Sequence, residues 1–198
     1  MYILPFFLLF LIWISYSKAR TQRKELEQEA AFWQKEEEAN ATRRKDISLL
    51  DYVRIPLDQL PIGIRPQDET LADCEAQILA LADEKILNLT GKTNTEIKLA
   101  YGAANLPFLD ECDQRFTNLA RTMQRWGARL YELSLTQEAK CVLAFAVSWG
   151  SDIKGSYVLL GRIYREERNE AALENLKARA GSLHSLMKEP ILKALSEL

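Results

Sequence analysis

Residues 121–151 read RTMQRWGARLYELSLTQEAKCVLAFAVSWGS, and they can be laid over residues 154–184, KGSYVLLGRIYREERNEAALENLKARAGSLH. Matched positions in both halves of this alignment are separated by the same number of residues, which we call the offset. The pairs are Tyr131 with Tyr164, Ala139 with Ala172 and Leu143 with Leu176. Unrelated helices would not keep one offset across both halves of a hairpin. The sequence therefore predicts two copies of a helix–turn–helix unit, as in helical repeat proteins.

The second copy resembles the tetratricopeptide repeat, a helix–turn–helix unit of about 34 residues. The resemblance depends on Leu160, Gly161, Tyr164, Ala172 and Leu176. The first copy is degenerate, because Gly127-Ala128 stands where the family has Leu-Gly. The resemblance covers two repeats over residues 121–184. It implies an all-α fold that serves as a protein-interaction scaffold and has no chemistry of its own.

The repeats belong to a larger tetratricopeptide-like domain that we expect at residues 70–198. Two repeats do not bury a continuous core, and about three are needed. Helical periodicity at residues 70–89, 94–103 and 108–119 predicts the helices that supply the missing faces. Pro190 suits the first turn of a final helix that caps the stack.

Local signals mark where these helices begin and end. Asp68 or Thr70 can cap the helix that follows, and Gly91 can end it. Thr93 or Asn94 can begin the next helix. The clearest amphipathic stripe comes after it, with apolar residues at three- and four-residue steps: Phe108, Cys112, Phe116, Leu119, Met123, Trp126 and Leu130. We expect this stripe to face the core.

Residues 1–17 carry no charged side chain and are mostly large and apolar. At about 1.5 Å per residue, a helix of this length covers roughly 25 Å, slightly less than a ~30 Å hydrocarbon core. This predicts an uncleaved transmembrane helix with residues 2–17 in the membrane, rather than a signal peptide, because no basic residue precedes the apolar run. Four basic residues follow between Lys18 and Lys24. The positive-inside rule then predicts a single-pass protein of the cell membrane with a cytoplasmic C-terminal domain.

Two segments connect this anchor to the helical domain. Residues 18–45 are rich in charged residues and helix formers and contain neither Gly nor Pro, which predicts a solvated helical stalk. Residues 46–69 contain three prolines spaced by five, with apolar residues between them. A flexible linker would be polar. We therefore expect an apolar strap that packs on the domain behind it, and a docking segment for a partner is the alternative.

Composition excludes several function classes. The chain of 198 residues has 26 basic and 28 acidic residues, so it has no general basic field that would attract nucleic acid. A single histidine, His184, excludes a multi-histidine metal site. The cysteines Cys74, Cys112 and Cys141 are too far apart for a CxxC pair, and we expect them to be core residues. We expect no metal and no cofactor.

Residues 90–93 read TGKT, which resembles the last part of a phosphate-binding loop. The full motif requires a glycine five residues before Gly91, where Ile86 stands, and a strand where we expect a helix. His184 has no triad-like residues near it in the sequence, and no hydrolase or metalloprotease motif is present. The sequence therefore favours a protein that is not an enzyme.

One constellation favours a binding function. In the tetratricopeptide family the first helix of each unit lines a concave groove. Transferring the groove-facing spacing to this chain selects Arg125, Arg129, Glu132, Val158, Arg162 and Arg165. Four arginines on one wall would clamp a carboxylate or an acidic peptide. The alternative is an ordinary solvated face of charged residues.

Together these features predict a membrane-anchored, non-enzymatic scaffold that presents a helical domain to a partner protein or acidic peptide. The alternative is a structural or assembly subunit of a membrane protein complex, held there through the strap and the anchor.

Overall fold

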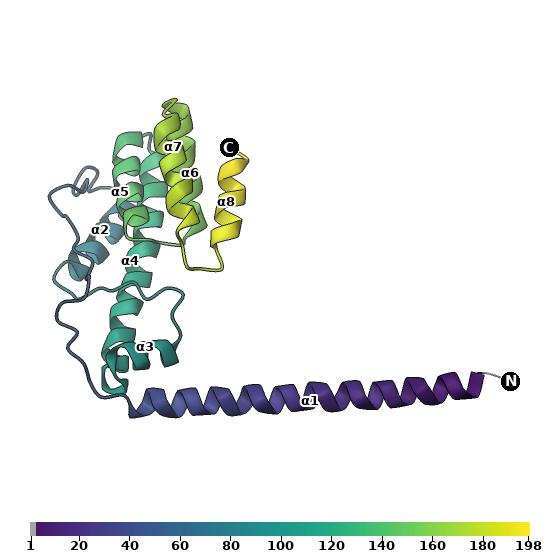
Figure 1. The fold of residues 1–198 in the computed structure, drawn as a ribbon. Helices are drawn as coiled ribbons and strands as arrows, with labels where there is room; N and C mark the ends of the chain where they lie inside the picture. The colour runs from purple at the N-terminus through teal and green to yellow at the C-terminus, as the bar shows by residue number, and fades with distance from the viewer. Residues whose placement is uncertain (1–2) are drawn as a thin grey trace. The chain divides into compact units, whose positions relative to one another are not determined.

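The computed structural model describes residues 3–198, apart from the side chains of residues 3–9, 11 and 12. This part of the chain contains no strand, so the expected all-α class is confirmed (Figure 1). Its helices are α1 (Ile3–Ala41), α2 (Glu69–Leu81), α3 (Asn94–Tyr101), the 3-10 helix η1 (Ala103–Asn105), α4 (Leu106–Glu132), α5 (Thr136–Ser148), α6 (Lys154–Glu166), α7 (Glu170–Gly181) and α8 (Lys188–Ser196). They form two compact units, one of Met1–Asp46 with Thr93–Leu106 and the other of Ile47–Lys92 with Pro107–Leu198.

The prediction of a transmembrane anchor is wrong. Among the described residues, no helix combines the length and the apolar character that crossing a bilayer requires. The helix α1 has 39 residues, but charged side chains begin at Lys18, and the uncharged run before it is shorter than a ~30 Å hydrocarbon core. The single-pass assignment and the cell-membrane location deduced from it are corrected accordingly. Residues 1 and 2 of the predicted anchor region lie outside the described residues.

In the first unit, polar contacts fasten the C-terminal end of α1 to α3. Glu36 of α1 accepts hydrogen bonds from Thr95 (2.7 Å) and from Lys98 of α3. These bonds, the one from Lys98 above all, hold the pKa of Glu36 below its usual value. The buried side chain of Asn105 donates to the carbonyl of Lys45 at 2.8 Å. The end of α1 is therefore positioned by specific hydrogen bonds as well as by packing.

Two helix starts follow the local signals in the sequence. Asp68 is the N-cap of α2, and its carboxylate accepts a hydrogen bond from the backbone N–H of Leu71 at 3.0 Å. Thr93 caps α3 and forms a reciprocal capping box with Glu96. Each bond satisfies a backbone donor that has no partner within the first turn.

The helix expected at residues 70–89 ends early, at Leu81. The residues beyond it are irregular, and both Ile86 and Leu87 are buried. Continuing the helix would have placed Lys85 on the same face as the buried Cys74 and Ile78 and carried its charge toward the core. The irregular path places the Lys85 ammonium 5.0 Å from the centre of the Tyr52 ring instead.

Residues 86–89 form an irregular segment that is nevertheless bonded to its neighbours. Its hydrogen bonds are Val53 N to Ile86 O (2.9 Å), Leu87 N to Cys112 O (3.2 Å) and Leu89 N to Asp113 Oδ1 (2.8 Å). The proline-spaced region contributes the first of these bonds, and it also buries Val53 and Leu60 in the core. Five apolar residues of this region, Val53, Ile55, Leu57, Leu60 and Ile62, therefore pack on the core of their own unit, whereas Leu49 is exposed.

The hairpins α4–α5 and α6–α7 have the same turn geometry. Equivalent residues in the two turns are one residue further apart along the chain than the predicted pairing of Tyr131 with Tyr164. Ser134 and Arg168 are the non-glycine residues with positive φ in the described chain, at 62° and 56°. Equivalent backbone hydrogen bonds close the two turns: Leu135 N to Leu130 O (2.9 Å) and Asn169 N to Tyr164 O (2.8 Å). Both comparisons give the same offset, since 168 − 134 and 169 − 135 are each 34.

The buried residues of the two hairpins are related by the same offset of 34 residues as the turns. The buried pairs that it relates are Met123 with Tyr157, Trp126 with Leu160, Gly127 with Gly161, Ala139 with Leu173, Val142 with Leu176 and Ala146 with Ala180. Trp126-Gly127 is therefore the counterpart of Leu160-Gly161. The first copy carries an apolar–glycine pair that the sequence alignment had displaced by one position.

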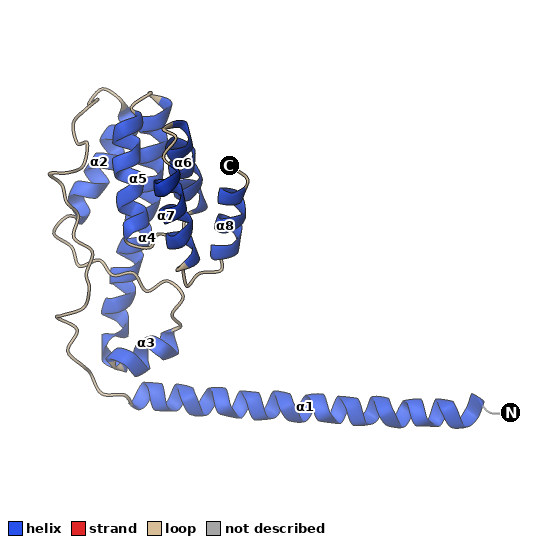
Figure 2. Ribbon diagram, turned by 45° about the horizontal axis from the view of Figure 1, so that its top comes forward, coloured by secondary structure: helices blue, strands red, loops and turns tan. Residues whose placement is uncertain are grey.

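Helices α4 to α8 lie side by side (Figure 2). One core joins buried residues of α2 and of α4 to α8. A Cβ at Gly161 would lie 2.7 Å from Leu198 Cδ1 and 2.9 Å from Leu195 Cδ2. The missing side chain therefore lets the C-terminal leucines pack closely on α6.

Candidate functional site

The predicted arginines of α4 are already bonded to α2. Arg129 donates to Oδ2 of Asp68 from Nε (3.0 Å) and from Nη2 (2.7 Å), and its Nη1 donates to Glu132 (2.9 Å). Arg125 forms an ion pair with Asp73. Since each arginine has a carboxylate from α2, the chain's own acidic side chains engage this part of the predicted wall.

Asp68 and Arg129 each stabilise the ionised form of the other side chain. The guanidinium of Arg129 and the N–H of Leu71 hold the pKa of Asp68 below its usual value of 3.8. The same carboxylate, with Glu132, raises the pKa of Arg129. Both groups are therefore charged throughout the neutral range, and Asp68 combines an ion pair with a helix cap.

We expect Asp68→Asn to remove a pH-dependent part of the stability, because asparagine keeps a cap oxygen but loses the charge. The folded pKa lies below 3.8, so the ionised carboxylate stabilises the fold above that pH. This contribution is lost as the pH falls from 3.8 through the folded pKa. The wild type should have the higher Tm near neutral pH, and the difference should fade in acid, as circular dichroism would show.

Asp58→Asn, which removes an exposed carboxylate that caps no helix, is the control and should change the Tm near neutral pH only slightly. A pH-independent gap between the wild type and Asp68→Asn would contradict the role of the ionised pair.

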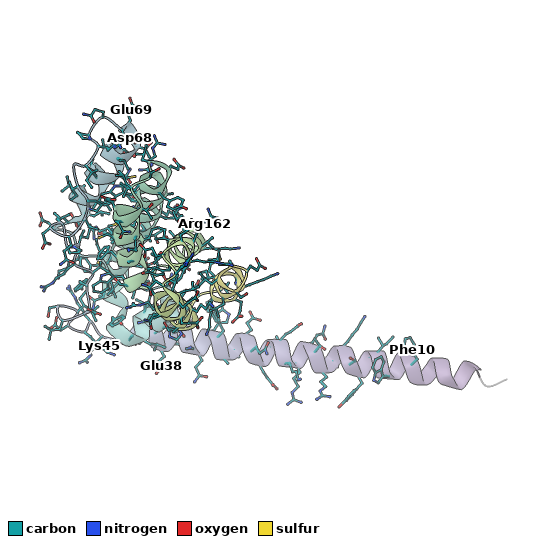
Figure 3. The ribbon with its side chains drawn as sticks, turned by 90° about the horizontal axis from the view of Figure 1, so that it is seen from above. Phe10, Glu38, Lys45, Asp68, Glu69 and Arg162 are labelled. Atoms are coloured by element: carbon teal, nitrogen blue, oxygen red, sulfur yellow. The ribbon has the colours of Figure 1, made fainter. Side chains whose placement is uncertain are left out.

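The α6 members of the predicted set lie elsewhere on the same unit. Arg162 and Arg165 are exposed, and Val158 is half-buried. Figure 3 shows Arg162 on α6 and Asp68 just before the first turn of α2. At the offset that relates the two hairpins, the counterpart of Arg129 is the buried Ile163. The structure gives no hydrogen bond or ion pair that joins the α4 residues of the predicted set to its α6 residues.

A groove lies between α2 and α4 and has a volume of about 480 Å³. It is lined by Gln77, Ala80, Leu81, Asn118, Arg121, Thr122 and Arg125. A hydrogen bond from Thr122 to Gln77 (2.9 Å) connects the two helices at this place. The groove therefore has apolar surface from α2 beside polar and basic side chains from α4.

Arg121 and Arg125 give this groove its charge. They are one helical turn apart and both exposed, so they are neighbours on the surface of α4. Within the described chain Arg121 has no hydrogen bond or ion pair, whereas Arg125 is paired with Asp73. Sequence reasoning selected Arg125 and missed Arg121. The signal was present, because Asn118, Arg121 and Arg125 recur at three and four residues on one polar face of α4.

Metal-ligating residue types and the buried thiols were the other candidates for a site. No group of three or more His, Cys, Asp or Glu residues within the described chain could hold a metal ion. Cys74 and Cys112 are buried, and burial raises the pKa of both thiols. A neutral buried thiol is a poor nucleophile. These cysteines therefore act as small core side chains.

No protein-family model, no curated protein and no solved structure gives a significant match to this chain.

Proposed function

We propose that this protein is a non-enzymatic binding protein whose tetratricopeptide-like helical unit holds an acidic segment of a partner protein in the groove between α2 and α4. Two features support the tetratricopeptide-like assignment. The turns of the hairpins α4–α5 and α6–α7 repeat at the period of that family, about 34 residues. Each hairpin also has an apolar–glycine pair at the equivalent buried position, Trp126-Gly127 and Leu160-Gly161.

The choice of an acidic ligand rests on Arg121, whose guanidinium has no partner within the described chain. Guanidinium groups bind carboxylates through two parallel hydrogen bonds, which gives both charge and direction. The groove beside Arg121 has a volume within the range of small-ligand sites, and Ala80 and Leu81 supply apolar surface. A partner segment with an acidic residue next to an apolar one fits both features.

The contacts between α2 and α4 supply an internal precedent. Asp68 and Asp73 show that guanidinium groups on this face of α4 pair with carboxylates from a neighbouring helix. A partner carboxylate would make the same kind of bond to Arg121, one turn further along. Because Arg121 is exposed, this attraction should weaken as salt concentration rises.

Peptide binding to the full chain tests the proposal. The probe is a fluorescein-labelled peptide of alternating Glu and Leu, with a Lys–Leu peptide as the charge control. We expect Arg121→Glu to weaken binding of the acidic peptide at least about tenfold, measured by fluorescence anisotropy, because one attractive charge becomes repulsive. The Lys–Leu peptide should not bind the wild type.

Arg162→Glu is the matched control, since it makes the same charge change on an exposed arginine of α6. It should leave the affinity nearly unchanged. If Arg162→Glu abolished binding and Arg121→Glu did not, the ligand would lie on α6 and the α2–α4 groove would be excluded. Equal small losses in both variants would indicate attraction by net charge alone and would also overturn the proposal.

A further inference from the structure

A second cavity, of about 280 Å³, lies in the same unit but has none of the lining residues of the α2–α4 groove. Its walls come from residues 88–92, from the C-terminal ends of α5 and α7, and from Tyr157 of α6. Gly91 has a φ of +84°, and a Cβ there would lie only 2.0 Å from the carbonyl oxygen of His184. The two backbone segments are thus in direct contact, which fixes one wall of the cavity.

Tyr157 of α6 is one of the residues that line the cavity. Tyr157 is fully buried, and its hydroxyl makes no hydrogen bond within the described residues. A buried polar group without a partner costs free energy, so native proteins rarely keep one without a reason. Burial raises the pKa of Tyr157 to about 12, which keeps the hydroxyl protonated at neutral pH. The group is therefore available as a donor.

The charged side chains that line the cavity are basic. They are Lys92 and Arg179, the imidazole of His184 also lines the cavity, and no carboxylate does. Arg179 is exposed and has no ion pair within the described chain, and its charge acts on the phenol of Tyr157. The charge of Asp152 raises the pKa of Tyr157 further, and Asp152 accepts a hydrogen bond from the hydroxyl of Ser185. The cavity thus combines one buried neutral donor with cationic groups at its rim.

We propose that this cavity binds a small phosphate-bearing molecule. Tyr157 donates a hydrogen bond to one phosphate oxygen, and the guanidinium of Arg179 donates to others. A volume of about 280 Å³ is near the lower end of the range for small-molecule sites, which suits a compact ligand. The recognition differs from that of a phosphate-binding loop, because side chains from separate helices supply the donors. The site is independent of the proposed peptide groove.

Thermal unfolding and calorimetric titration of the full chain test this proposal. The probes are inorganic phosphate and glycerol 3-phosphate, with sodium chloride at matched ionic strength. We expect either probe to raise the wild-type Tm in a saturable way, because a ligand that binds only the folded state stabilises it. Tyr157→Phe should keep or raise the Tm without phosphate, since it removes an unpaired buried hydroxyl, and it should weaken phosphate binding at least tenfold. Arg179→Gln should weaken binding to a similar extent.

Tyr164→Phe is the matched control, because Tyr164 is on the same helix, two turns further on, and does not line this cavity. It should bind phosphate as the wild type does. Stabilisation that persists unchanged in Tyr157→Phe and Arg179→Gln would come from general exclusion of phosphate from the surface and would overturn the proposal. The absence of saturable binding by both probes would overturn it as well. A preference for glycerol 3-phosphate over inorganic phosphate would identify an organic phosphate as the ligand.

Discussion

Replacing Trp126 with alanine is expected to lower the free energy of unfolding by about 3–5 kcal/mol, the usual range for removing a large aromatic side chain from a core. Trp126 of α4 is fully buried in the core that joins α2 with α4 to α8. Its truncation would leave a cavity in this core. Urea unfolding followed by circular dichroism measures the loss.

Two further variants make this prediction specific. The indole Nε1 of Trp126 has no hydrogen-bond partner within the described chain, so Trp126→Phe removes an unsatisfied donor together with some volume. Its loss should be clearly smaller than that of Trp126→Ala. Trp33, with 60% of its surface exposed on α1, is the control, and Trp33→Ala should change stability by no more than about 0.5 kcal/mol. A similar loss in both alanine variants would contradict the assignment of Trp126 to the core.

Replacing Gly91 with alanine is expected to lower the free energy of unfolding by more than the roughly 1–2 kcal/mol that a left-handed backbone conformation alone costs a residue with a Cβ. At Gly91 the Cβ would also stand 2.0 Å from the carbonyl oxygen of His184, so the two segments would have to separate. This collision adds to the conformational cost. Thermal and urea unfolding of the variant give the loss.

Gly63→Ala separates these two causes. Gly63 has nearly the same φ, +79°, but a Cβ there would meet nothing within 4 Å. It should therefore show the conformational cost without the collision, and Gly91→Ala should be clearly the more damaging substitution. If the two variants lost the same stability, the close contact at His184 would have no energetic role.

The parts of the fold that short-range chemistry controls could be predicted from the sequence. Asp68 and Thr93 begin helices because their side chains accept hydrogen bonds from free backbone N–H groups a few residues away. Such a local interaction can be predicted from the neighbouring residues alone. The apolar stripe of α4 was predicted for the same reason. It is buried at Cys112, Phe116, Leu119, Met123, Trp126 and Leu130.

The end of α2 and the register of the repeat could not be predicted, because they depend on contacts between residues that are distant in sequence or on backbone geometry. The end of α2 at Leu81 depends on where Ile86 and Leu87 find hydrogen-bond partners and core contacts, and these partners are distant in sequence. The repeat offset was misjudged by one position because the identity of Tyr131 and Tyr164 outweighed the turn geometry. Positive φ at Ser134 and Arg168 marks the true register, and neither residue type signals it.

The candidate groove was predicted in part. Arg125 was selected from the family spacing, and the structure places it in the groove lining. The role of α2 was not foreseen, because it depends on Asp68 and Asp73 reaching α4 across a long stretch of intervening sequence. Pairing between acidic and basic side chains that are so far apart has no periodicity that a single sequence can reveal.

The hydrogen bonds of residues 86–89 separate two properties that are often equated. This segment has no regular secondary structure, yet the amide hydrogens of Leu87 and Leu89 are bonded to α4 and both side chains are buried. Deuterium uptake here is therefore governed by opening of the core, as for a helix, and not by the rapid exchange of a surface loop. A peptide map of exchange would place these residues among the slow regions of the protein, so slow exchange at this position reports tertiary bonding and not helicity.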